Sequence, residues 1–135
     1  MRSGRPTARN LVYAFFNKGM YAEALAEEIR LLELVGDKDL VAALARGNEE
    51  GGYPGAMRLA AEKLVARSKR TYVQPTMIAD FCVRAGDKDR ALDWFEEAFQ
   101  VHDTQLWYVN VVPHLAVLRS DPRFQDLLRR MKLPS

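Results

Sequence analysis

The chain has 135 residues, a length that suits one domain or a short array of small repeats and can bury a core without metal or disulfide support. Apolar residues make up 48% and charged residues 28%, and 20 basic against 18 acidic residues give a net charge of +2. These values exclude a disordered chain, a collagen and a disulfide scaffold, and they provide no overall basic field for nucleic acid. The single cysteine, Cys82, cannot form an internal disulfide, and no run of 18 apolar residues occurs. We therefore expect a cytoplasmic protein with no membrane partner.

Helices are predicted along most of the chain from the spacing of apolar residues and from capping signals. Their expected ranges are 7–18, 22–35, 37–46, 54–68, 75–84, 87–101 and a C-terminal helix that begins at Pro122. In the second of these, the inward stripe is predicted to be Leu25, Ile29, Leu32 and Val35. The segment Leu106 to Val112 is β-branched and aromatic, and it is the one plausible strand.

The C-terminal helix has a strong start signal in Ser120-Asp121-Pro122, where a capping side chain precedes a proline at the first helical position. Its apolar stripe consists of Phe124, Leu127, Leu128 and Met131. A helical array needs a terminal element that covers its last apolar face and turns a polar face to water. We expect this helix to be that cap.

Three stretches share a local pattern in which a glycine is followed five residues later by an alanine. The pairs are Gly19 and Ala24, Gly51 and Ala56, and Gly86 and Ala91. The glycine closes one helix in the left-handed conformation, and the small alanine lets the next helix approach closely. The glycines are 32 and 35 residues apart, which indicates a repeated helix pair.

The chain resembles the tetratricopeptide repeat family, whose helix–turn–helix unit has a period of about 34 residues. The segments 85–92 and 118–124 also look like the C-terminal repeat modules of large bacterial regulators, in which the repeats often follow a kinase or winged-helix domain. The resemblance implies an all-α array of about three helical hairpins within one domain, 1–135. The repeats would span about 5–36, 37–70 and 72–103, followed by a C-terminal capping region, 104–135.

This resemblance also implies a function. Such arrays bind a peptide or a helix of a partner protein in a concave groove, so a non-enzymatic interaction module is the leading hypothesis. The alternative is a regulatory or oligomerisation module of a larger kinase or transcription regulator. By resemblance, the groove would be lined by Arg9, Tyr13, Asn17, Val41, Ala45, Glu49, Thr76, Asp80 and Arg84. Tyr13 and Arg84 are expected to be surface anchors that can be replaced without loss of the fold.

Trp107 and Tyr108 form a second candidate surface near the C-terminal end. They could be interface anchors, for example in a homodimer, or the last core layer beneath the capping helix. The residue pattern leaves both alternatives open.

Catalytic and metal-binding patterns are not found in the sequence. The histidines, His102 and His114, are too far apart and too few for a zinc site, and Cys82 lies between Phe81 and Val83 as a core residue would. Two groups of carboxylates are predicted to lie on solvated helix faces: Glu23, Glu27, Glu28 and Glu33, and Asp93, Glu96 and Glu97. The basic run 67–70 is interpreted as a helix C-terminus rather than a phosphate site. No enzyme activity, cofactor, metal or nucleic-acid partner is therefore expected.

Overall fold

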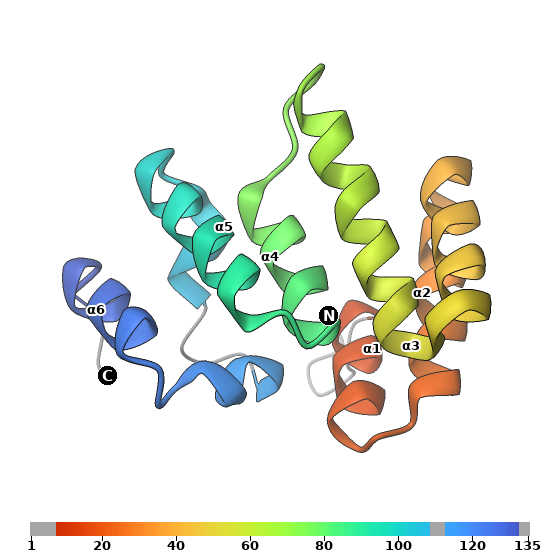
Figure 1. Ribbon diagram of the computed structural model, residues 1–135, viewed down its shortest axis with the longest axis horizontal. Helices are drawn as coiled ribbons and strands as arrows, with labels where there is room; N and C mark the ends of the chain where they lie inside the picture. Colours follow the sequence, from red (N-terminus) through yellow and green to blue (C-terminus); the bar gives the residue numbers. More distant parts are fainter. Residues whose placement is uncertain (1–7, 109–112, 133–135) are drawn as a thin grey trace, which may run out of the picture.

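The computed structural model describes residues 8–108 and 113–132, and this part of the chain is helical and contains no strand (Figure 1). The elements are α1 (Ala8–Asn17), α2 (Tyr21–Leu34), α3 (Lys38–Ser68), α4 (Pro75–Arg84), α5 (Lys88–Gln100) and α6 (Pro122–Arg130), with 3₁₀ helices η1 (Thr104–Tyr108) and η2 (Pro113–Leu118) before α6. The all-α prediction is confirmed. Where a strand was considered plausible, residues 106–108 belong to η1, and residues 109–112 lie outside the described part.

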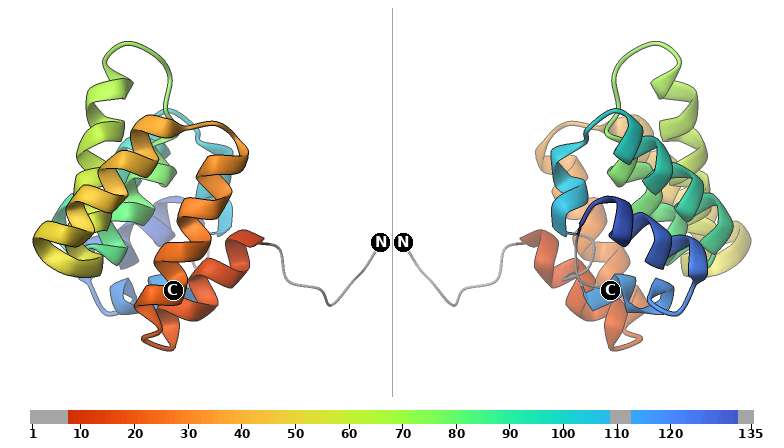
Figure 2. Two further views of the ribbon diagram at one scale, coloured as in Figure 1. Left: turned by 90° about the vertical axis from the view of Figure 1, so that its right-hand side faces the viewer. Right: turned by 90° about the vertical axis from the view of Figure 1, so that its left-hand side faces the viewer.

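The long helix α3 is a hairpin of two helices joined by a turn at Gly51 and Gly52, where the backbone leaves the helical region. Gly52 has a φ of +67°, which glycine adopts without a steric penalty. A straight helix of 31 residues would be about 46 Å long. Asp37, just before its start, nevertheless accepts two hydrogen bonds of 2.9 Å from Arg67, near its end. The predicted break before Pro54 is confirmed, and the first half continues past Arg46 to the glycine turn (Figures 1 and 2).

The two halves of α3 touch backbone to backbone near this turn. A Cβ atom added at Gly47 would lie 2.4 Å from the carbonyl oxygen of Gly55, far closer than real atoms approach. Only a residue without a side chain fits at this position, so Gly47 fixes how tightly the hairpin closes.

The same tetrapeptide, Gly-Asp-Lys-Asp, spans the start of two helices, at 36–39 and 86–89. In each case the first aspartate accepts a hydrogen bond from a backbone N–H in the first turn. Asp37 accepts from Leu40 at 3.2 Å and Asp87 from Arg90 at 3.3 Å. The same local sequence therefore produces the same N-cap for α3 and for α5.

Consecutive helices pack in pairs, α1 on α2 and α4 on α5, with the α3 hairpin between them (Figure 2). The three alanines predicted at close helix contacts, Ala24, Ala56 and Ala91, are all fully buried, which confirms their role in packing. They share one core with larger side chains such as Phe81 and Phe95. Small residues at these positions let the paired helices approach closely.

The C-terminal region covers α5 and also returns to the first helix. In α6, the predicted stripe of Phe124, Leu127, Leu128 and Met131 is buried, and Phe124 packs at 6.4 Å, ring to ring, on Phe95 of α5. The 3₁₀ helix η2 packs against both α1 and α4. The 3₁₀ helix η2 therefore covers part of the face that α1 and α4 share, and α6 covers α5.

Candidate functional site

Four charged side chains meet where α1, α2 and α4 converge, and we call them the buried network: Arg9, Glu28, Asp80 and Arg84. Glu28 Oε1 accepts a hydrogen bond from Arg9 Nη1 at 2.6 Å and another from Arg84 Nη1 at 3.0 Å. Arg84 Nη2 donates to Asp80 Oδ2 at 2.5 Å. The side chains of Glu28 and Arg84 are 0% exposed. Two cations and two anions thus balance one another inside the fold.

Aromatic rings enclose the cations of this network. The guanidinium carbon of Arg84 lies 4.7 Å from the ring centroid of Phe81 and 5.5 Å from that of Tyr13. The guanidinium carbon of Arg9 lies 6.0 Å from the Tyr13 ring centroid. The Tyr53 hydroxyl, from the second half of α3, accepts a hydrogen bond of 3.2 Å from Arg84 Nη1. These rings remove water from the ion pairs and add cation–π attraction.

The surroundings keep the arginines of the network charged and the neighbouring tyrosines, Tyr13 and Tyr53, neutral. Burial alone would lower the pKa of Arg84, but the charges of Asp80 and Glu28 outweigh it and raise this pKa well above the usual value. Burial, and then the charge of Asp80, raises the pKa of Tyr13. Burial likewise raises the pKa of Tyr53. None of these arginine and tyrosine groups is therefore poised to exchange a proton near neutral pH, as a general acid or base must.

Two atoms of the network have no hydrogen-bond partner within the described residues, Glu28 Oε2 and Arg84 Nε. A buried polar atom without a partner carries a desolvation penalty of about 1–3 kcal/mol. The network therefore constrains how α1, α2 and α4 fit together, at a cost in stability.

Four of the residues expected in the groove do come together in space. Arg9 and Tyr13 of α1 meet Asp80 and Arg84 of α4, while Asn17 is exposed at the end of α1. The expectation that Arg84 is a surface anchor is wrong, because Glu28 pairs with it inside the core. The Arg9 side chain is 37% exposed, so the network reaches solvent at this edge.

Glu28 is the residue that sequence reasoning missed. The sequence analysis predicts a solvated position for it, yet it lies between Ala24 and Leu32 on the buried face of α2. The signal was its spacing of four residues from each of these apolar neighbours. The apolar stripe predicted for this helix is therefore only partly correct. Leu32 is buried, but Leu25 and Ile29 are only partly buried, and Val35 is largely exposed.

Asp103 is a second buried carboxylate, and its role is structural. It accepts hydrogen bonds from the backbone N–H of Thr76 at 3.1 Å and from the Thr76 hydroxyl at 2.9 Å. It also accepts from the N–H of Gln105 at 2.9 Å. A residue that follows α5 therefore caps the N-terminus of α4. Thr76, expected in the groove, is engaged in this cap.

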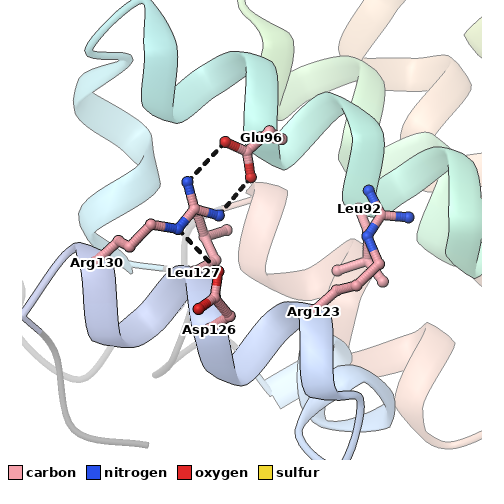
Figure 3. A pocket seen from close by; sticks show the side chains of 6 residues that line it. All are labelled: Leu92, Glu96, Arg123, Asp126, Leu127 and Arg130. Atoms are coloured by element: carbon pink, nitrogen blue, oxygen red, sulfur yellow. Dashed lines mark hydrogen bonds and ion pairs between the residues drawn. The ribbon is translucent and has the colours of Figure 1, made fainter.

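A hollow of about 240 Å³ lies between α5 and α6, and ion pairs cross it (Figure 3). Arg130 donates to the two carboxylate oxygens of Glu96 at 2.5 and 2.8 Å, and to Asp126 at 2.9 Å. The hydrogen bonds from Arg130 lower the pKa of Glu96 to about 2. We call this set the surface clasp. It ties α6 to α5 with charges that already satisfy one another.

One further sequence prediction concerns the single cysteine. Cys82 is buried, as predicted, and burial raises the pKa of its thiol to about 11, which keeps it protonated. Among the side chains that the structure describes, no three or more from histidine, cysteine, aspartate or glutamate are grouped so that they could hold a metal ion. No helix in these ranges is both long and apolar enough to cross a membrane. The side chains of Trp107, Tyr108 and His114 lie outside the described part of the structure.

Comparison with known proteins gives no relative from which function could be read. No family model, no curated protein and no solved structure matches this chain. Membership of the tetratricopeptide repeat family therefore stays a prediction from the residue pattern.

Proposed function

We propose that this chain is a non-enzymatic interaction module that binds a peptide or a helix of a partner protein on the part of the face shared by α1 and α4 that η2 does not cover. The observation that carries the proposal is the convergence of Arg9, Tyr13 and Asp80 on this face. Arg9 and Glu28 are 19 residues apart in sequence, and Glu28 and Arg84 are 56 apart. Side chains from three helices are thus held together at the edge of one surface.

The physical properties of this edge suit recognition. Tyrosine and arginine are the residue types that most often anchor protein interfaces. Here Glu28 holds Arg9 by an ion pair, and the arginines hold the ring of Tyr13. Side chains that are fixed in advance lose little conformational entropy on binding, so each contact with a partner contributes more affinity.

The same features argue against catalysis at this site. The arginines and tyrosines have raised pKa values, and the four charges are already paired with one another. A catalytic pair needs two titratable groups whose environments push their pKa values apart around the working pH. An interaction role therefore fits the network better than an enzymatic role.

The test is affinity capture with four variants of the full chain. Arg9→Gln and Asn17→Glu change the exposed edge of α1, and Glu23→Gln, on the exposed face of α2, is the matched control. We expect a partner captured by the wild type to be lost with the first two variants and kept with the control. Arg84 is left intact because its removal would disturb the core. Loss of the partner only with Trp107→Ala would place the site at the C-terminal end instead.

A self-association role is the second candidate, and one observation favours it. Leu34 and Val35, neighbours at the end of α2, are large apolar residues that are mostly exposed. Adjacent exposed apolar side chains mark contact surfaces more often than charged ones do. Sedimentation of the wild type beside Leu34→Glu would reveal an oligomer that depends on this surface, and a monomeric wild type would dismiss it.

A further inference from the structure

A groove of about 660 Å³ lies between α5 and the segment that links α3 to α4. This linking segment rises at the top of the view in Figure 1. Tyr72 and Val73 line the groove from the linking segment, Trp94 and Glu97 line it from α5, and Val101 lines it from the residue that follows α5. None of these residues belongs to the buried network or to the surface clasp.

The groove presents apolar and aromatic surface to solvent. Trp94, Glu97 and Val101 are spaced i, i+3 and i+7, so Trp94 and Glu97 share one face of α5 and Val101 extends it. Trp94 is partly buried, Val101 is exposed, and Tyr72 across the groove is 70% exposed. Large apolar side chains gathered around a hollow are typical of a contact site for another molecule.

The charge of the groove wall is negative. Asp93 and Glu97 line it, and no lysine or arginine does. Asp93 is compensated by Arg123, whose Nη2 lies 2.7 Å from Asp93 Oδ1. Within the described residues Glu97 has no ion pair. Of the two carboxylates that line the groove, Glu97 is therefore the one that can pair with a ligand. Lys69 and Arg70 belong to the same linking segment but do not line the groove.

We propose that this groove binds a short segment of a partner protein that presents an arginine or a lysine beside an apolar side chain. The cation would lie against the ring of Trp94 or Tyr72, where the negative π face attracts it. It would also form a charge-assisted hydrogen bond with Glu97. The apolar neighbour would cover Val101 and Val73.

This inference goes beyond the proposed function, because it places a second binding surface on residues that are not part of the buried network. An acidic segment is disfavoured by the carboxylates of the wall. A second copy of this chain could present its own basic N-terminal residues, Arg2 and Arg5. The test below separates that occupant from a partner segment.

The experiment is a titration of ¹⁵N-labelled full-length protein, followed by NMR, with three tripeptides: acetyl-Leu-Arg-Leu-amide, acetyl-Leu-Gln-Leu-amide and acetyl-Leu-Glu-Leu-amide. We expect the arginine peptide to shift the amides of 68–74 and 93–101 and the indole N–H of Trp94, with saturation in the millimolar range. The glutamine peptide should bind at least threefold more weakly, and the glutamate peptide should give no saturating shift. A Trp94→Phe variant assigns the indole signal.

A matched pair of variants tests the role of Glu97. Glu97→Gln should weaken the arginine peptide at least threefold, and Glu23→Gln, at an exposed position of α2, should leave its affinity unchanged. The proposal is overturned if all three tripeptides bind equally, if the shifts fall on α1 and α4, or if no shift appears at 10 mM peptide. Shifts of the same amides with protein concentration alone would assign the groove to a second copy, which also overturns it.

Discussion

The buried network and the surface clasp are both built from arginine and carboxylate side chains, but they differ in their surroundings. In the network, the Glu28 and Arg84 side chains are 0% exposed, and one polar atom on each lacks a partner within the described residues. In the clasp, Glu96 and Arg130 are 38% and 37% exposed, and Arg130 pairs with two carboxylates. The chemistry is the same, and the access of water is different.

The difference shows what burial does to an ion pair. Water screens the clasp and solvates each partner if the other is removed, so such pairs contribute about 0–1 kcal/mol. In the network, Glu28 and Arg84 rely on each other because their side chains are fully shielded from water. Removing one partner of a buried pair therefore costs several kcal/mol, even where the intact pair contributes little net stability.

The largest effect is expected from Arg84→Met, which leaves the buried Glu28 with only Arg9 as a partner. We expect a loss of about 3–5 kcal/mol in the free energy of unfolding, measured by urea denaturation. The double variant Glu28→Leu/Arg84→Met removes both fully buried charges and should recover much of this loss. A single variant that loses under about 1 kcal/mol would show that the network is more solvated than its burial indicates.

The next largest effect is expected from a substitution in the apolar contact between α4 and α5, which changes packing rather than an ion pair. Ala91 is fully buried at the start of α5, and Ala91→Leu should overpack it by about 1–3 kcal/mol. Glu23→Leu on the exposed face of α2 should change stability by less than about 0.5 kcal/mol. Equal melting temperatures for the two variants would contradict the assignment of these helix faces.

Arg9→Gln should give an intermediate effect, because Arg9 is partly exposed while its partner Glu28 is fully buried. We expect a loss of about 1–2 kcal/mol, since Arg84 still neutralises Glu28 and water reaches the vacated edge. Urea denaturation measures it beside Arg84→Met. A loss as large as that of Arg84→Met would mean that Arg9 is the dominant partner of Glu28.

The smallest effect is expected from Glu96→Gln in the surface clasp, at most about 1 kcal/mol at neutral pH. Its pH dependence is the sharper test. Arg130 lowers the pKa of Glu96 from 4.5 to about 2, so the stabilisation is complete above pH 4.5 and is lost as the pH falls toward 2. Over this interval the wild type should lose more stability than the variant. Parallel curves of unfolding free energy against pH would contradict the ion pair.

Much of the helical framework could be predicted because its signals are local. Asp121 accepts a hydrogen bond of 2.8 Å from the N–H of Arg123, and Pro122 begins α6, as the sequence indicated. Gly19 and Gly86 adopt positive φ as predicted, and in the middle pair Gly52 does so in place of Gly51. A cap or a turn depends on residues within about one helical turn, so a short stretch of sequence specifies it.

The candidate site could be predicted only in part. The resemblance to a repeat array predicted that Arg9, Tyr13, Asp80 and Arg84 lie on one face. These four side chains do come together in the structure. The spacing of Glu28 from Ala24 and Leu32 indicated that it lies on the buried face of α2, but nothing in the sequence indicated that it would meet Arg9 and Arg84. A glutamate is predicted to be exposed because of its charge. Whether it is buried depends on finding an oppositely charged partner inside the fold.

The amino-acid sequence by itself determined where helices begin, where glycine turns end them, and which alanines allow close contact. Only the tertiary structure decided that Glu28 and Arg84 are internal, that Asp103 caps a helix 27 residues earlier, and that η2 returns to α1. The physical reason is distance along the chain. Helix signals act between residues a few positions apart, whereas the burial of a charge depends on segments that meet only when the whole chain has packed.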